Sequence, residues 1–355
     1  MMKVLQHTSV QHGGDLDCAT SLFGRPEQGW LDLSTGISPW PYPVPAIPDT
    51  IFHHLPYNHH HLLLAAEQYY ACPYEFILPT NGSQDVIVRI PYLLPKAKVA
   101  LPKIGYQEHC RWWSKAGHTP YFYCSYKMLE QYVADNPDSH IVIINPNNPL
   151  AKTWTIDRLL SLQKNLNDNA YMIVDEAFMD LAPDSSLATH ISSERHNLIV
   201  LRSLGKFFGL AGLRLGFVLG NNPLLKALRE QLQPWSVNHP ALWLGEKVLL
   251  DSAWQTEQRQ TISRQSQQLH TALAAWCSFE LHSAGLFSTV FGPTSRLQPF
   301  YVHAAKQGVL FRYAELPKGQ SWLRCGLPGE HWQRLQQLLQ TSTTRLNHDL
   351  DNAVL

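Results

Sequence analysis

Residues 203–216 read SLGKFFGLAGLRLG and come just after the apolar run LIVL at 198–201. An apolar run bounded by turn residues predicts a buried strand, so Lys206 is expected just beyond a strand end, among small residues. Arg214 follows it eight positions later. A lysine that forms a Schiff base must be close-packed and able to lose its proton, while a nearby hydroxyl and arginine can hold a phosphate. Taken alone, Lys206 is more simply interpreted as a surface lysine before a glycine-rich turn.

Two more apolar runs lead into polar residues. YMIV at 171–174 is followed by Asp175, and IVII at 141–144 is followed by NPNNP, which contains Asn148. A carboxylate beside a pyridine nitrogen keeps that nitrogen protonated, and an asparagine amide can donate to the ring's phenolic oxygen. Ligands of doubly wound sheets bind beyond the carboxyl ends of the strands. The three segments together therefore indicate a cofactor site far more specifically than any one of them.

Strand-like and helix-like stretches alternate along the chain. This pattern predicts an α/β fold, with a mostly parallel sheet in a large domain flanked by helices and a smaller α/β C-terminal domain. Strands are expected at 99–101, 141–144, 171–174, 198–201 and 216–219, and helices at 58–70, 84–94, 156–166, 223–233 and 330–339. Five prolines between 39 and 48 predict an extended arm. The expected division is an N-terminal arm at 1–48, a large domain at 49–238 and a small domain at 239–355.

The composition excludes several classes of protein. The 355 residues hold 28 basic and 28 acidic side chains without a basic stripe, so no nucleic-acid partner is expected. Hydrophobic residues reach 45% and charged residues 16%, which favours a compact globule. The six cysteines form no CxxC pair, and neither a signal peptide nor a span of about 20 apolar residues is present, which predicts a cytoplasmic protein with no membrane contact. The histidines at 53, 54, 59, 60 and 61 are interpreted as a solvated face, so no metal is expected. Trp112-Trp113 is interpreted as part of the core or as a subunit contact.

The quoted segments resemble the pyridoxal-phosphate enzymes of aminotransferase fold type I. Within that family they are similar to the branch that holds histidinol-phosphate aminotransferase and the threonine-phosphate decarboxylase of cobalamin biosynthesis. The resemblance implies pyridoxal 5'-phosphate as cofactor, with Lys206 as the Schiff-base lysine, Asp175 as the partner of the pyridinium nitrogen and Tyr106 as the aromatic residue stacked on the ring. The residues implied in cofactor binding are Gly82, Ser83, Gln84, Tyr106, Asn148, Asp175, Ser203, Lys206 and Arg214. A helix that opens at Ser83 would offer free N–H groups to the phosphate, which agrees with this assignment.

The resemblance also implies substrate contacts outside the large domain. Arg324, in WLRCGLP, matches the arginine that grips an amino-acid carboxylate, and Arg312 matches the one that meets a substrate phosphate. His12, on an N-terminal arm, would help to bind that phosphate, and Gly36 and Asn148 complete the implied substrate site. The substrate class is therefore a phosphorylated amino acid.

Three features favour the decarboxylase side of the branch. They are the opening HGGD at 12–15 with WLDLSTGISP at 30–39, Phe178 in place of the tyrosine of many aminotransferases, and the ending WLRCGLPG at 322–329. The expected reaction is decarboxylation of L-threonine O-3-phosphate to (R)-1-amino-2-propanol O-2-phosphate. The alternatives are a histidinol-phosphate-type or other amino-acid aminotransferase, or a non-catalytic partner of the synthase that joins the linker to the corrin ring.

The sequence departs from the family pattern at three places. Leu150-Ala151 replaces the usual Thr-Gly after Asn-Asn-Pro, Gly205 replaces a hydroxyl residue before the lysine, and Leu55 stands near where a neighbouring subunit lends a tyrosine, the nearest one being Tyr57. None of these changes touches Lys206 or Asp175, so cofactor binding is still expected. The family's two-fold active site implies a homodimer, and a cobalamin-pathway synthase is a possible further partner.

Overall fold

The computed structural model describes residues 12–57, 59–192, 195–232 and 234–351, the last nine of these by their backbone alone. The chain forms two compact units, Trp40–Arg259 and Met1–Pro39 with Gln260–Leu355. The N-terminal segment up to Pro39 belongs to the same unit as the C-terminal part of the chain, because β1 (Leu31–Leu33) pairs in parallel with β11 (Val309–Leu316). The division expected from the sequence, with borders after residues 48 and 238, differs from these units at both borders and stays a prediction. Within the described part of the chain, no helix is long and apolar enough to cross a membrane.

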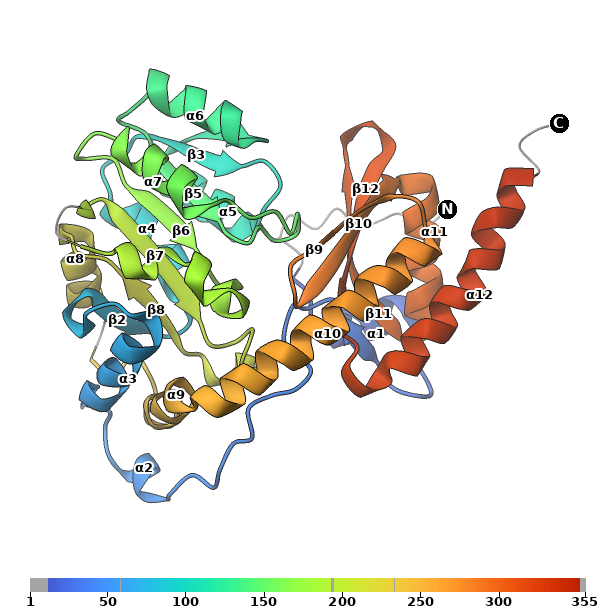
Figure 1. Ribbon diagram of the computed structural model, residues 1–355, viewed down its shortest axis with the longest axis horizontal. Coiled ribbons are helices and arrows are strands. Elements are labelled where there is room, and N and C mark those ends of the chain that lie inside the picture. The colour runs from blue at the N-terminus through green and yellow to red at the C-terminus, as the bar shows by residue number, and fades with distance from the viewer. Residues whose placement is uncertain (1–11, 58, 193–194, 233, 352–355) are drawn as a thin grey trace. The chain divides into compact units, whose positions relative to one another are not determined.

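The larger unit is built on a seven-stranded sheet in the order β2-β8-β7-β6-β5-β3-β4 (Figure 1). Neighbours from β7 through β4 are parallel, whereas β8 runs antiparallel to both β7 and β2. The strands are β2 (Ile77–Thr80), β3 (Lys98–Pro102), β4 (Thr119–Tyr123), β5 (His140–Ile144), β6 (Met172–Asp175), β7 (Leu198–Ser203) and β8 (Gly216–Leu219). Strands β5, β6 and β8 are buried along their whole length, as expected for strands with both faces covered.

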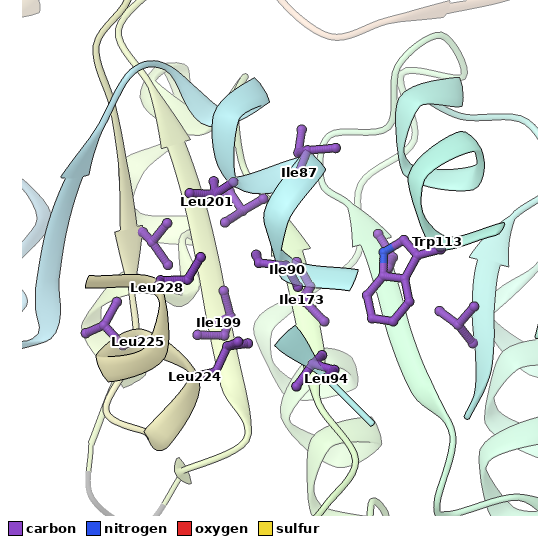
Figure 2. Packing of buried hydrophobic residues seen from close by; sticks show 14 of the residues in the cluster. Ile87, Ile90, Leu94, Trp113, Ile173, Ile199, Leu201, Leu224, Leu225 and Leu228 are labelled. Atoms are coloured by element: carbon purple, nitrogen blue, oxygen red, sulfur yellow. The ribbon is translucent and has the colours of Figure 1, made fainter. Parts of the chain in front are cut away.

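Helices cover this sheet. Apolar side chains of α4 (Ser83–Leu93), α5 (Gln107–Lys115) and α8 (Pro223–Gln231) pack on strand residues such as Ile173, Ile199 and Leu201 in one core cluster (Figure 2). In Figure 1, α6 (Tyr126–Asp135) and α7 (Ile156–Lys164) lie in front of the sheet. The remaining helices of this unit are α2 (Thr50–His53), α3 (His60–Tyr70) and α9 (His239–Leu250), and α10 (Ser252–Trp276) begins in it.

The five strands expected from the sequence are confirmed as β3, β5, β6, β7 and β8. Strands β2 and β4 were not predicted, and each contains a proline, Pro79 and Pro120. Both strands lie at the edges of the sheet, where a missing N–H removes no bond of a central ladder. The expected helix at 330–339 is confirmed but is longer, since α12 runs over Trp332–Asp351.

The smaller unit holds a five-stranded sheet in the order β1-β11-β12-β10-β9. Its further strands are β9 (Glu280–Ser283), β10 (Phe287–Pro293) and β12 (Gln320–Gly326), and its helices are α1 (Leu16–Phe23), α11 (Thr294–Lys306), α12 and the last turns of α10. Strands β11 and β12 are antiparallel, and their register puts Arg312 directly opposite Arg324. The short strand β1 lies in the segment that the sequence predicted only as an extended arm.

Candidate active site

A cavity of about 140 Å³ lies beyond the carboxyl ends of β5, β6 and β7 in the larger unit. It brings together residues that are far apart in the sequence. The lining consists of Ser83, Gln84, Ile87, Tyr106, Ile144, Asn148, Asp175, Ala177, Phe178, Ser203, Lys206 and Arg214. Every residue expected at the cofactor lines this cavity except Gly82. Gly82 directly precedes Ser83 in the chain and lies against the side chain of Arg214.

Lys206 lies in a tight turn after β7. Gly205 N–H donates to the Ser203 hydroxyl over 3.3 Å, and the lysine Nζ lies 5.4 Å from the centre of the Phe178 ring. Gly209 closes the turn with φ of 67°, and a Cβ there would lie 2.6 Å from the Cα of Pro41. Glycine is needed at this position both for its conformation and for the close approach. The turn therefore holds Lys206 against an apolar ring beside a hydroxyl group.

Asp175 ends β6 with only 5% of its surface exposed. Its Oδ1 accepts the N–H of Ala177 at 3.1 Å, and its Oδ2 lies 2.9 Å from Nε2 of His109. The buried His109, which comes from α5, was not predicted from the sequence. The signal that could have found it is its i,i+3 spacing from Tyr106, which places both residues on one side of the helix start. Their rings meet edge to face at 6.2 Å.

The Asn-Pro-Asn-Asn-Pro loop uses its asparagines in different ways. Asn145 accepts the N–H of Trp154 at 2.8 Å, and Asn147 accepts that of Leu150 at 3.0 Å, so both side chains hold the loop in shape. Asn148 instead lines the cavity. The loop thus delivers one amide to the site.

Two glycines let an arginine and a helix end come together at the cavity. Helix α4 begins after Gly82, which has φ of 74° and provides no side-chain cap. A Cβ on Gly82 would lie 2.6 Å from Nη2 of Arg214, and a Cβ on Gly216 would lie 2.7 Å from the backbone nitrogen of Ser83. An uncapped helix N-terminus next to a guanidinium is a favourable environment for a phosphate group.

A buried ion cluster lies behind the ends of β6 and β7. Arg202 donates to Glu176 at 2.9 Å and to Asp180 at 2.6 Å, and Ser186 donates to Glu176 at 2.5 Å. Burial raises the pKa of Glu176, and the charge of Arg202 opposes that shift. Glu176 and Arg202 are chain neighbours of Asp175 and Ser203, so the cluster joins the two strand ends that carry cavity residues.

The smaller unit contains a separate cavity of about 270 Å³, whose lining includes His12, Ser34, Tyr301 and Arg312. Arg324 is buried beside it in the sheet, opposite Arg312, and donates to the carbonyl oxygen of Ser34. Burial, with the charge of Arg312 second, lowers the pKa of Arg324 to about 10. Two adjacent guanidinium groups repel each other, so this environment favours an anion.

The remaining predicted substrate residue is separate from these. Gly36 is buried in the loop after β1 and does not line the cavity of the smaller unit. The structure therefore brings His12 and Arg312 into one cavity, sets Arg324 next to Arg312, and leaves Gly36 outside this group.

The structure shows the surroundings of three positions at or near the departures from the family pattern. Ala151 adopts φ of 56°, a left-handed conformation suited to glycine. A side chain at Gly205 would bring a Cβ to 3.2 Å from the Cα of Ala211, so the tight turn leaves little room there. Tyr57 is 75% exposed in the chain and its ring contacts Trp235 edge to face.

Comparison with known proteins identifies the family of the chain. The family model "Aminotransferase class I and II" matches residues 50–341. A threonine-phosphate decarboxylase of Pseudomonas aeruginosa is 39% identical over 93% of this chain and 97% of its own length, and one of Sinorhizobium sp is 36% identical over 68% and 72%. The solved histidinol-phosphate aminotransferase of Sinorhizobium meliloti, in complex with pyridoxal-5'-phosphate, has a TM-score of 0.77 at 16% identity and covers 99% of this chain and 98% of that one, which shows a shared fold. The chain therefore belongs to the aminotransferase class I and II family.

Proposed function

We propose that this protein decarboxylates L-threonine O-3-phosphate to (R)-1-amino-2-propanol O-2-phosphate for cobalamin biosynthesis, with pyridoxal 5'-phosphate as its cofactor. The observation that carries the proposal is the 39% identity to a threonine-phosphate decarboxylase over nearly the whole of both chains. The cavity of the larger unit supports it, because a lysine, a buried carboxylate and an amide meet there beside a phosphate-type environment.

The residues at this cavity fit the cofactor. The space that Gly82 leaves beside Arg214, together with the uncapped start of α4, suits a phosphate held by Ser83, Ser203 and Arg214. Asp175 would meet the pyridine nitrogen, Asn148 the phenolic oxygen and Tyr106 the face of the ring. Lys206 supplies the amine that would hold the cofactor covalently.

When bound, pyridoxal 5'-phosphate supplies an electron sink for the electron pair that departing CO₂ leaves at Cα. Asp175 favours a protonated ring nitrogen, and the contact with His109 holds the carboxylate in place. Lys206 is the proton carrier of the site, and its amine would deliver the proton that Cα gains. The carboxylate leaves as CO₂ and one proton takes its place at Cα, so atoms and charge balance in the reaction.

Substrate recognition is assigned to charged groups. Arg324 and Asn148 are each proposed to bind the substrate carboxylate, whose bond to Cα is the one that breaks. Arg312 and His12, which line one cavity, would bind the phosphate, and Gly36 is kept as a proposed substrate contact outside that cavity. A guanidinium is well matched to either anion, because its planar donors pair with two oxygens at once.

Transamination is the second candidate. The resemblance of the sequence to the branch that also holds histidinol-phosphate aminotransferase favours it, and the same Lys206 would then remove the Cα proton. The amine of Lys206 and the carboxylate of Asp175 serve either reaction, and a purely non-catalytic partner of the synthase would need neither.

We also propose a homodimer. Its support is a set of exposed apolar side chains in the larger unit, with Phe52 63%, Leu55 55% and Tyr57 75% exposed. Contiguous exposed apolar patches mark interaction surfaces, and these three residues lie close together in the sequence. The cobalamin-pathway synthase as partner and the cytoplasm as location are retained as proposals from the family resemblance.

The test is product analysis by mass spectrometry. Purified protein loaded with pyridoxal 5'-phosphate is given L-threonine O-3-phosphate, with and without 2-oxoglutarate. Aminopropanol phosphate and CO₂ formed without any keto acid support the proposal, whereas glutamate formed only with 2-oxoglutarate establishes the aminotransferase. Lys206→Ala should lower turnover by at least about 10²-fold, and the exposed Lys152→Ala, in the neighbouring loop, is the matched control.

A further inference from the structure

We propose that Glu108 is a positioning residue for the cofactor, which acts through Gln84 to fix the hydroxyl group of Tyr106. The proposal rests on the proposed function, in which the Tyr106 ring lies on the cofactor. It adds a relay of three side chains that runs from the cavity into the body of the larger unit.

The relay is continuous. The Tyr106 hydroxyl donates to Oε1 of Gln84 over 2.8 Å, and Nε2 of Gln84 donates to Oε2 of Glu108 over 3.1 Å. Tyr106 and Gln84 both line the cavity, whereas Glu108 lies outside the lining and is only 3% exposed. Gln84 lies in the first turn of α4, Tyr106 directly precedes α5, and Glu108 lies in the first turn of α5.

The carboxylate sets the direction of both hydrogen bonds. An ionised carboxylate can only accept, so Gln84 must turn its NH₂ group toward Glu108. The carbonyl oxygen of Gln84 then faces the cavity side, and Tyr106 must be the donor to it. A phenol beside a fixed acceptor always donates, whereas a phenol beside a freely flipping amide could either donate or accept, and its hydrogen bond would be less well defined.

Glu108 is itself held by further donors. Trp112 Nε1 donates to the same Oε2 over 2.8 Å, and Arg111 Nη1 donates to the other oxygen, Oε1, over 3.3 Å. The Trp112 ring also contacts two cations, with Arg111 Cζ 5.5 Å and Lys115 Nζ 4.7 Å from its centre. The Trp112 contact keeps Oε2, the oxygen that serves Gln84, in place.

The relay therefore fixes the ring at the end opposite to its backbone attachment. One edge of the same ring meets His109, which contacts Asp175. Glu108 thus couples the position of the stacking ring to the group that faces the ring nitrogen of the cofactor. Its substitution should change how the cofactor is held without removing any group that touches it.

The experiment compares Glu108→Leu with the wild type by two measurements that need no substrate. These are the dissociation constant of pyridoxal 5'-phosphate and the visible circular dichroism of the bound cofactor, which reports its asymmetric surroundings. Loss of one charge-assisted hydrogen bond predicts binding weaker by about 10-fold or more and a reduced dichroic signal. Glu108→Gln keeps an acceptor but also offers an NH₂ group, so the hydrogen bonds of the relay could run in the opposite direction. Its cofactor affinity and dichroic signal should lie between those of the wild type and Glu108→Leu.

Arg111→Gln is the matched control, because it removes the partner of Oε1 and leaves both donors to Oε2. Its dissociation constant for the cofactor and its visible circular dichroism should equal those of the wild type. The pair Tyr106→Phe and Tyr106→Phe/Glu108→Leu gives a double-mutant cycle. If Glu108 acts through the hydroxyl, Glu108→Leu has little further effect once that hydroxyl is gone.

Wild-type affinity and dichroism in Glu108→Leu would overturn the proposal, as would full additivity in the cycle. If Glu108→Leu does not fold, Trp112→Phe, which removes one donor to Oε2, replaces it and should shift the same two signals in the same direction. Failure of the wild type to bind the cofactor at all would instead contradict the proposed function.

Discussion

Ala151 has a positive φ of 56° in the loop that carries Asn148. An L-residue pays about 1–2 kcal/mol for this conformation, because its Cβ approaches the following carbonyl oxygen. The loop imposes it through two backbone bonds of 2.8 Å, from Ala151 N–H to the Asn147 carbonyl and from Asn147 N–H to the Lys152 carbonyl. The sequence shows the residue but not its φ, so only the structure explains why the family pattern has glycine here.

Ala151→Gly is expected to stabilise the protein. The gain from relieving the backbone exceeds the added entropy of the unfolded chain, and the net increase in the free energy of unfolding is about 0.5–1 kcal/mol. Chemical denaturation measures it. Ala116→Gly is the control, since Ala116 has φ of −74° and its replacement should destabilise. A loss of stability in Ala151→Gly would show that the loop is not strained.

At the scale of elements, the ends of β6 and β7 depend on the buried Arg202. It pairs with Glu176 and Asp180, and all three side chains are at most 2% exposed. Arg202→Met leaves two buried carboxylates without their cation, which should cost about 3–5 kcal/mol in the free energy of unfolding. Arg229→Met, at an exposed position of α8, should change it by less than about 0.5 kcal/mol. Equal effects of the two substitutions, measured in urea, would contradict a structural role for the cluster.

The start of β5 makes stability depend on pH. His140 accepts the Tyr171 N–H at 3.1 Å and donates to the Pro95 carbonyl at 3.2 Å, and burial lowers its pKa to about 4. The unfolded chain therefore binds the proton first, so stability is lost as pH falls from about 6.5 to about 4, at about 1.4 kcal/mol per pH unit. His140→Gln keeps an acceptor and a donor but does not titrate. Unfolding of that variant across this range should show a shallower dependence on pH, and an unchanged slope would exclude His140 as the cause.

Most strands of the large sheet, and the residues at their carboxyl ends, could be predicted from the sequence. Apolar runs without proline were recognised as β3, β5, β6, β7 and β8, and the polar residues at their ends were placed at one cavity. The edge strands β2 and β4 were missed, because Pro79 and Pro120 resemble breaks in a strand pattern until the strand is known to lie at an edge. His109 and Glu108 were missed for another reason: their role depends on contacts with Asp175 and Gln84, which come from distant strands and helices.

At the scale of the whole molecule, the exposed Phe52, Leu55 and Tyr57 test the proposed dimer. Analytical ultracentrifugation of the wild type should give twice the mass of the chain. Phe52→Glu with Leu55→Glu would bury charge in an interface, so it should shift the protein toward monomer and lower its activity. Phe122→Glu is the control, because Phe122 is 42% exposed on the edge strand β4. A wild-type monomer with full activity would contradict the dimer.

The most direct test of the proposed reaction follows the hydrogen at Cα. L-threonine O-3-phosphate that carries deuterium at Cα is converted in ordinary water by the loaded protein, and the product is examined by mass spectrometry and NMR. Decarboxylation breaks the bond to the carboxylate, so the aminopropanol phosphate should retain the deuterium and gain one solvent proton beside it. Release of the deuterium to water, with the carboxylate retained in the product, would contradict the account.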